Sequence, residues 1–220
     1  MDKKLAGACT AELIGTFALT FIGGGAILNG QAGLVGVAVA HGLALATMIS
    51  AMGHISGGHF NPAVTLGLLS IGKIKVVDAV AYWVVQFGGA ILAGLLLKSV
   101  FPGVDLLNAT PHLVGTHSRV LGILVEAVLT FFLLSAVLGT AVDRNAPKIG
   151  GFGIGLTVTM DILMGGPITG AAMNQARWLG TGVFAKVSCP DGWVYLIGPA
   201  IGAVAAAVVY QFLFSAEARS

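Results

Sequence analysis

The stretch Ser56-Gly-Gly-His-Phe-Asn-Pro-Ala-Val64 decides how this chain folds, because it carries the signals of a helix start inside an apolar region. Asn61 is a strong helix N-cap, and Pro62 suits the first helical position, where its missing N–H would have no partner. The helix predicted here, about 61–70, is too short to cross a bilayer, since a spanning helix needs about 20 residues. The stretch therefore predicts a segment that enters a membrane and stops inside it.

A second segment of the same kind follows 113 residues later in the chain. Asn174-Gln175-Ala176 follows Gly170 at the spacing with which Asn61-Pro62-Ala63 follows Gly57, and it predicts a second short helix over about 174–184. Matching segments at a fixed offset indicate an internal repeat, as in many membrane channels and transporters.

The composition around these segments is that of an integral membrane protein. The 220 residues include 11 Lys and Arg and 9 Asp and Glu, together 9%, whereas soluble domains carry about 25% charged residues. No charged residue occurs between Glu12 and Lys73. The net charge of +2 is too small to indicate a nucleic-acid partner, and two cysteines are too few for a disulfide framework or a four-ligand zinc site. We expect no catalytic residue, no cofactor and no metal.

The apolar runs divide into six spans, which are long enough for helices and lack the alternating pattern of membrane strands. The predicted spans are 7–28, 34–53, 79–98, 120–141, 150–167 and 193–214. Three spans fall in each half of the repeat, about 7–98 and 120–214. The second half must then enter the membrane from the opposite side, so the fold class is an all-α membrane protein with an inverted repeat.

Two half helices that enter from opposite faces bring their N-termini together near the midplane. Irregular backbone at that depth persists only where it is buried in protein or lines water. The carbonyls expected to face a pore are those of Gly57, Gly58, His59, Phe60, Gly170, Ala172 and Met173. The amides of Asn61 and Asn174 would donate to passing molecules while the positive helix ends repel cations. Residues 1–220 are thus predicted to form a single transmembrane channel domain.

Three carboxylates lie within the apolar spans, where an unsatisfied charge is costly. We expect Glu12 and Glu126 to accept hydrogen bonds from the half-helix loops and to hold these loops in place. Asp161 has no evident partner in the sequence, and we expect a structural hydrogen bond there. The alternative is a coupled secondary transporter in which the three carboxylates are proton sites.

The distribution of basic residues orients the chain by the positive-inside rule. One set of loops and termini holds Lys3, Lys4, Lys73, Lys75, Arg144, Lys148 and Arg219. The other set holds Lys98, Arg119, Arg177 and Lys186. Both termini are therefore predicted to be cytoplasmic, and the short termini make a prokaryotic inner membrane the expected location.

The motifs quoted above resemble those of the aquaporins, or major intrinsic proteins, over essentially the whole chain. The stretch from Ser56 to Val64 is highly specific to that family, and Gly155 to Ile162 with Gly170 to Asn174 resembles the plant tonoplast intrinsic and vertebrate ammonia-permeable branches. The resemblance implies a right-handed bundle of six tilted helices plus two re-entrant half helices. It also implies a homotetramer in the lipid bilayer that passes water and small neutral solutes through one pore in each subunit and excludes ions and protons.

By the same resemblance, the narrowest point of the pore is lined by His41, Ile162, Ala171 and Arg177. Arg177 offers several N–H donors and a fixed positive charge. A filter of His, Ile, a small residue and Arg is similar to the set that passes ammonia, and in some relatives urea or hydrogen peroxide, beside water. Trp178 stands where glycerol channels usually have Asp, which argues against a dedicated glycerol channel.

Gln175 departs from the family pattern, which has Pro at this position of the second motif. Asn174, the donor, is retained, while the ring that would pack against Pro62 is lost. We expect slightly looser packing where the two half helices meet. The property that this change would affect is the barrier to protons. The departure leaves a second alternative, a non-conducting homologue that serves as a membrane scaffold.

Overall fold

The computed structural model describes residues 3–145, 147–189 and 191–214; Arg219, counted above among the basic residues, lies outside them. Six long helices carry the fold: α1 Lys3–Leu28, α2 Gly33–Ser56, α4 Val76–Val100, α5 Arg119–Val137, α6 Gly150–Thr169 and α8 Gly192–Val209. A π-helical turn extends two of them, η2 Leu138–Val142 after α5 and η3 Tyr210–Phe214 after α8. The short elements are the half helices α3 Pro62–Ser70 and α7 Gln175–Gly182 and the 3-10 turn η1 Leu106–Ala109.

The predicted all-α fold with six spans and two half helices is confirmed. With their π-helical turns, the six long helices have 20 to 26 residues and are apolar enough to cross a membrane. The largest difference is in α1, which begins at Lys3 rather than at residue 7. Lys3 and Lys4 precede the apolar run, but lysine is a good helix former, so the helix begins before the apolar segment.

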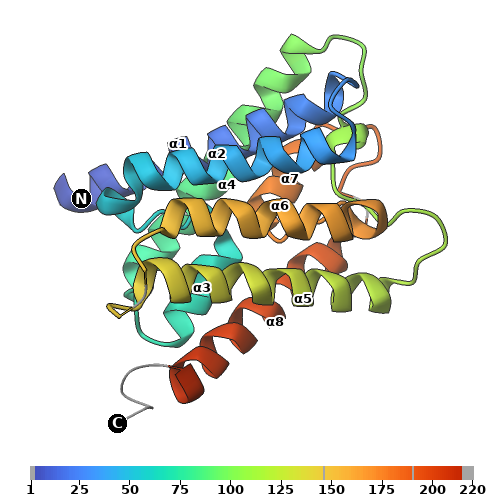
Figure 1. The fold of residues 1–220 in the computed structure, drawn as a ribbon. Coiled ribbons are helices and arrows are strands. Elements are labelled where there is room, and N and C mark those ends of the chain that lie inside the picture. Colours follow the sequence, from blue (N-terminus) through green and yellow to red (C-terminus); the bar gives the residue numbers. More distant parts are fainter. Residues whose placement is uncertain (1–2, 146, 190, 215–220) are drawn as a thin grey trace.

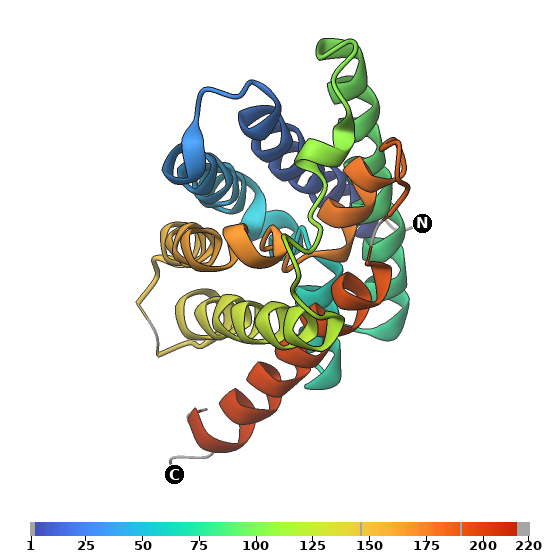
Figure 2. The same cartoon turned by 90° about the vertical axis from the view of Figure 1, so that its right-hand side faces the viewer.

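The two halves of the chain pack in equivalent ways. In the first half α1 lies against α2 and α4, and in the second half α5 lies against α6 and α8. Each half helix packs mainly against the last long helix of the other half, α3 against α8 and α7 against α4. Viewed along the bundle in Figure 2, the long helices surround the two half helices, so both halves are needed to enclose the centre.

Glycines allow the closest helix crossings, and the crossings repeat between the halves. A Cβ placed on Gly89 of α4 would overlap the carbonyl of Leu13 in α1, and one on Gly202 of α8 would overlap the carbonyl of Ala127 in α5. Small residues at membrane helix crossings let backbones approach and pack by van der Waals contact. These two glycines therefore set the helix spacing in each half.

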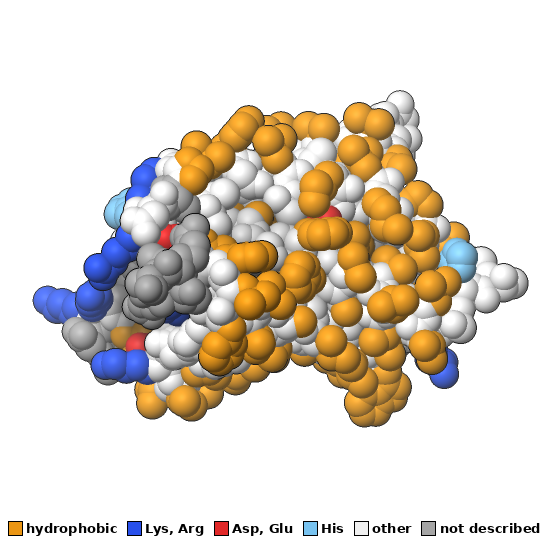
Figure 3. All heavy atoms as spheres, turned by 60° about the horizontal axis from the view of Figure 1, so that its bottom comes forward, with side chains coloured by type: hydrophobic (Ala, Val, Ile, Leu, Met, Phe, Trp, Pro, Cys, Tyr) orange, Lys and Arg blue, Asp and Glu red, His pale blue; other side chains and the backbone are white. Residues whose placement is uncertain are grey.

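The surface separates into an apolar side and two polar ends. Figure 3 shows hydrophobic side chains along the bundle and most Lys and Arg side chains at the end where α1 begins. We call this end the basic face, and the other end, with Lys98, Arg119 and Lys186, the opposite face. On the opposite face Asp105 accepts hydrogen bonds from the backbone amides of Leu107 and Lys186, which hold the pKa of that carboxyl below its usual range.

We predict that Gly89→Ala destabilises the protein by about 1–3 kcal/mol, the usual cost of overpacking, because the new methyl group forces α1 and α4 apart. The neighbouring Gly88→Ala is the matched control, since a Cβ there meets no other atom within 4 Å. Thermal unfolding in detergent micelles compares the two. Equal stability of both variants would contradict the assigned crossing.

Candidate pore

Each half helix begins at an asparagine that caps it. The Asn61 side chain accepts a hydrogen bond from the Ala63 amide at 2.8 Å. The Asn174 side chain accepts from the amides of Ala176 at 3.0 Å and Arg177 at 3.1 Å. Both asparagines have extended backbone, as an N-cap requires. The side-chain oxygens are therefore used by the caps, and each amide nitrogen points away from its own helix.

The two asparagines also join the halves to each other. The Asn61 amide nitrogen donates to the Met173 carbonyl at 2.8 Å, and the Asn174 amide nitrogen donates to the Phe60 carbonyl at 2.9 Å. Phe60 and Met173 have positive φ values of 49° and 52°, which turn their carbonyls toward the other half. An amide nitrogen carries two hydrogens, so one N–H of each asparagine is left for a molecule beside it.

Glu12 of α1 holds the first re-entrant loop. It accepts hydrogen bonds from the amides of His59 at 2.9 Å and Phe60 at 2.6 Å. The Ser56 hydroxyl and the Gln86 side-chain amide donate to the same carboxylate at 2.7 and 2.8 Å. Glu12 is fully buried, and four donors surround its two oxygens. The carboxylate thus satisfies backbone groups for which no regular secondary structure provides a partner.

Glu126 of α5 holds the second re-entrant loop in the same way but with three donors. The amides of Ala172 and Met173 donate to it at 2.9 and 2.7 Å, and the Thr169 hydroxyl donates at 2.6 Å. Two tyrosines complete the correspondence, because Tyr82 donates to the Ser56 carbonyl and Tyr195 donates to the Thr169 carbonyl.

At one pair of positions in the repeat, proline and glutamine exchange places. The first half has Pro62 at the start of α3 and Gln86 in α4, whereas the second half has Gln175 at the start of α7 and Pro199 in α8. Pro199 explains why Glu126 has one donor fewer than Glu12, since proline has no side-chain amide like that of Gln86.

The bond that ties each half helix to the next long helix is also reversed. In the first half, Trp83 of α4 donates through its indole nitrogen to the Pro62 carbonyl at 3.1 Å. At the equivalent position in the second half, Gln175 of α7 donates to the Leu196 carbonyl of α8 at 3.4 Å. Gln175 lacks the proline ring expected at this position, but its side chain links α7 to α8. Both bonds between the asparagines and the opposing loops are kept.

The four residues predicted for the filter surround one narrow cavity. His41, Ile162, Ala171 and Arg177 all line it, together with both asparagines. Arg177 donates through Nε to Nε2 of His41 at 3.0 Å, and Nδ1 of His41 lies 2.8 Å from the Val37 carbonyl. Because Arg can only donate, Nε2 must accept, and Nδ1 carries the hydrogen and donates to Val37. Both ring nitrogens of His41 are then occupied within the protein.

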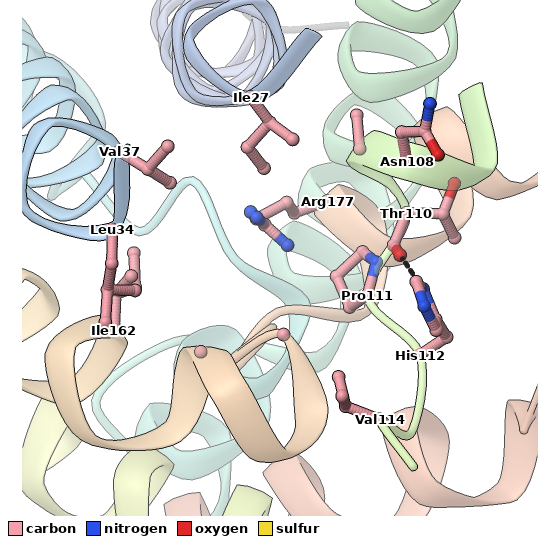
Figure 4. A pocket seen from close by; sticks show the side chains of 13 residues that line it. Ile27, Leu34, Val37, Asn108, Thr110, Pro111, His112, Val114, Ile162 and Arg177 are labelled. Atoms are coloured by element: carbon pink, nitrogen blue, oxygen red, sulfur yellow. Dashed lines mark hydrogen bonds between the residues drawn. The ribbon is translucent and has the colours of Figure 1, made fainter. Parts of the chain in front are cut away.

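Arg177 supplies the free donor of this constriction. Its side chain is 5% exposed, and Nη1 has no hydrogen-bond partner in the described part of the chain. In Figure 4 the guanidinium reaches from α7 into the opening between Ile27, Val37 and Ile162. Ile162 and Ala171 contribute only apolar surface, so the polar contacts available to a solute here come from one side.

Four cavities follow one another along the bundle and share their lining residues. A cavity of about 250 Å³ on the opposite face shares Ile162 and Arg177 with the narrow filter cavity. The filter cavity shares Asn61 and Asn174 with a second narrow cavity, which shares His59 with a cavity of about 860 Å³ on the basic face. Each narrow cavity has a volume of about 10 Å³, roughly enough for one water molecule.

The residues expected to offer pore carbonyls line these cavities with one exception. Gly57, Gly58, His59, Gly170, Ala172 and Met173 each line at least one of the four cavities. Phe60 lines none of them, which corrects the expectation for this residue. Its carbonyl accepts from Asn174 as the Met173 carbonyl accepts from Asn61, so the difference lies in its ring, which packs against Gly15 of α1, where a Cβ would overlap it.

Asp161 differs from the other two buried carboxylates. It is 2% exposed, yet its Oδ2 has no hydrogen-bond partner among the described residues. Asp161 also lines none of the four cavities. We expected a structural hydrogen bond for Asp161, and Oδ2 forms none within the described ranges. No group of three metal-ligating side chains occurs in these ranges either.

A family match and related sequences place the chain among the same proteins, and a solved structure shares its fold. The sequence matches the family described as Major intrinsic protein over residues 1–210. The chain belongs to this family, the aquaporins. Aquaporin TIP4-4 of Zea mays is 44% identical over 98% of this chain and 90% of the relative, and Nodulin-26 of Glycine max is 36% identical over 92% and 76%. The X-ray structure of the aquaglyceroporin from Plasmodium falciparum has the same fold, with a TM-score of 0.87 at 23% identity over 98% of this chain and 99% of that one.

As an aquaporin, the chain is an integral multi-pass membrane channel for water and small solutes and belongs to a transport family, not an enzyme family. The expected prokaryotic inner membrane is wrong. The relatives are plant aquaporins of Zea mays, Arabidopsis thaliana, Oryza sativa and Glycine max, which points to a eukaryotic plant membrane. Short termini and loop charges indicate how a chain is oriented in a membrane. They do not indicate which organism the membrane belongs to.

Gly23 of α1 belongs to this site, although nothing in the sequence motifs marked it. A Cβ on Gly23 would overlap the His41 ring at Nε2, the atom that accepts from Arg177. The absence of a side chain at position 23 therefore gives His41 its place. Only the contact between α1 and α2 shows this role, because glycines are common throughout the apolar spans.

We predict that Gly23→Ala lowers solute permeability of the channel about tenfold, equivalent to roughly 1.4 kcal/mol on the barrier. The methyl group pushes the His41 ring toward the constriction and breaks its bond to Arg177. Stopped-flow light scattering on proteoliposomes measures the change. Gly25→Ala is the matched control, because a Cβ there meets only Leu97 at an ordinary 3.6 Å. A parent-like Gly23→Ala channel would remove Gly23 from the site.

We predict that Gln175→Pro leaves water permeability and proton leak of the channel unchanged, because Asn174 and Glu126 hold the centre and Gln175 lines neither narrow cavity. Asn174→Ala, in contrast, loses the cap and should cost about 1–2 kcal/mol of stability. A pH-sensitive dye inside proteoliposomes reports the leak. A tighter proton barrier in Gln175→Pro would instead support the looser centre that the sequence suggested.

Proposed function

We propose that the chain is a passive channel that passes water, ammonia and other small neutral solutes and excludes ions and protons. The observation that carries this proposal is the series of four cavities from one face to the other, each of which shares lining residues with the next, with two central cavities of about 10 Å³. A cavity of that volume holds about one water, so we expect solutes to pass in single file and to exchange their water contacts for contacts with the wall.

The wall chemistry supports the exclusion of cations. The free N–H groups of Asn61 and Asn174 and the guanidinium of Arg177 are donors, and the N-termini of α3 and α7 add positive potential at the centre. Donors and positive potential favour oxygen or nitrogen lone pairs and oppose cations. A water between the asparagines would turn its oxygen toward both, which interrupts a chain of hydrogen bonds that could carry protons.

The filter supports ammonia among the solutes. Ile162 and Ala171 present no donor or acceptor side chain, and His41 has both ring nitrogens engaged. Among the four filter side chains a solute therefore meets one free donor, Arg177, which suits a small molecule with one lone pair. Urea and hydrogen peroxide are further candidates because both are small and neutral.

The two alternative functions find no support in the geometry. A proton-coupled transporter would use Glu12, Glu126 or Asp161, but the first two are held by several donors each and the third lines none of the four cavities. A silent scaffold would need a blocked centre, whereas a narrow cavity lies on each side of the two asparagines and Gln175 lines neither of them. We also propose a homotetramer; because the path lies within one chain, each subunit holds a complete pore.

We predict that His41→Phe lowers ammonia permeability more than water permeability, because a larger apolar ring narrows the filter on one side. Arg177→Ala should let protons or small cations leak, since it removes the charge and the free donor of the constriction. Stopped-flow scattering and internal pH dyes on proteoliposomes measure both fluxes in one preparation. Arg119→Ala, at an exposed arginine of the opposite face, serves as the control.

Ammonia flux no faster than in empty liposomes would overturn the assigned solute, and ammonia flux that requires an imposed proton gradient would favour the coupled transporter. Parent-like behaviour of both filter variants would show that selection occurs elsewhere along the path.

A further inference from the structure

The largest of these four cavities lies at the basic face. It measures about 860 Å³, and its floor includes Ser56, Gly57 and His59 of the first re-entrant loop. Its rim includes Lys73, Lys75, Asp78 and Lys148, and we call the whole cavity the basic vestibule. Ligand sites in proteins commonly measure about 300–1,000 Å³, so the basic vestibule has room for a molecule far larger than the solutes of the pore.

The charges of the basic vestibule are not balanced within the described residues. The side chains of Lys73 and Lys75 form no hydrogen bond or ion pair in these ranges, and the one ion pair formed there, Arg119 with Asp191, lies on the opposite face. Lys148 donates to the Asp143 carbonyl at 3.1 Å, which leaves its charge without a carboxylate. Asp78 is the single carboxylate that lines the cavity, against three ammonium groups.

Two helix starts add positive potential to the same place. α4 begins after Lys75 and α6 begins after Ile149, and neither N-cap side chain makes a capping hydrogen bond. Lys75 and Gly150, at these helix starts, line the basic vestibule. An N-terminus carries about half a positive elementary charge. The carbonyl ends of α2, at Ser56 and Gly57, and of the α5 helix, at Val142, also reach the cavity with the opposite sign, so its excess positive charge comes from the three lysines.

A positive cavity of this size does nothing for neutral solutes, whose free energy does not depend on net charge. The positive-inside rule explains basic residues in the loops on this face, but it does not require that they surround a cavity above the pore. The cavity on the opposite face shows the contrast, because it is about 250 Å³ and Arg177 is the single Lys or Arg that lines it.

We propose that the basic vestibule binds an anion carrying several phosphate groups and that the bound anion obstructs the path from this face. Lysine is a point-charge partner of phosphate, and uncapped helix starts offer backbone N–H groups to the same oxygens. A free polyphosphorylated metabolite and a phosphorylated lipid headgroup share this chemistry. Binding stands independently of the proposed function, while obstruction rests on it.

The binding test uses the full chain in detergent with inositol hexakisphosphate as the probe, followed by isothermal titration calorimetry. We expect saturable binding that weakens with added salt, as for any multivalent charge contact. The double variant Lys73→Gln/Lys75→Gln should weaken it about tenfold or more. Lys98→Gln/Lys186→Gln, with the same loss of charge on the opposite face, should bind like the parent.

Asp78→Asn is the decisive variant because its expected effect is a gain. Removing the single carboxylate of the basic vestibule should tighten binding several-fold, which a damaged or misfolded protein would not do. Absence of binding, equal binding in all variants, or unchanged affinity in Asp78→Asn would each overturn the site. Binding lost equally in the two double variants would show attraction by net charge alone and would overturn it as well.

The obstruction test measures water permeability of proteoliposomes with the probe on both sides of the membrane, so that insertion direction does not matter. The parent should lose most of its permeability, and Lys73→Gln/Lys75→Gln should keep it. Unchanged permeability of the parent at a saturating probe concentration would overturn obstruction while leaving binding intact. Vesicles containing phosphatidylinositol bisphosphate form the second arm; inhibition there without inhibition by the free probe identifies a lipid headgroup as the source.

Discussion

The fold depends on satisfying the backbone of two loops that lie inside the bundle. Loop backbone at that depth has no regular secondary structure to bond with, and Glu12 and Glu126 supply the missing acceptors. Each carboxylate bonds to consecutive amides, which fixes the loop directly before its asparagine. The asparagines can then cap their helices and donate to the carbonyls of the opposing loop. Without the two carboxylates neither the caps nor the constriction would have a defined position.

The exchange of proline and glutamine between the halves shows how a repeat tolerates change. Gln175 departs from the first motif, and the sequence alone suggested a looser centre. The structure instead shows Gln175 bonded to α8 where the first half uses a bond from Trp83 to α3. The two arrangements join the same pair of elements through opposite donors. What is kept between the halves is the connection, while the residues that make it have changed.

Spans, half helices and the residues around the constriction could be predicted because each rests on local patterns or quoted motifs: long apolar runs, Asn caps and Arg177. Gly23 could not be predicted, because its role is to leave room for a ring on another helix. Phe60 departed from the expectation for a related reason, since its ring packs into the space left by Gly15 on another helix. The basic vestibule could not be predicted either. In the sequence its lysines indicate only the orientation of the chain, and the fold shows that they line one cavity.

The crossed packing of the half helices has a consequence for the origin and assembly of such chains. Because α3 rests on α8 and α7 rests on α4, neither half encloses a path by itself, yet each provides what the other lacks. A half-length ancestor would have worked only as a pair of copies inserted in opposite directions. In the fused chain the connection between α4 and α5 keeps the partners at equal numbers and in opposite orientations, while the packing of α2 against α6 and the interlocked half helices hold them together.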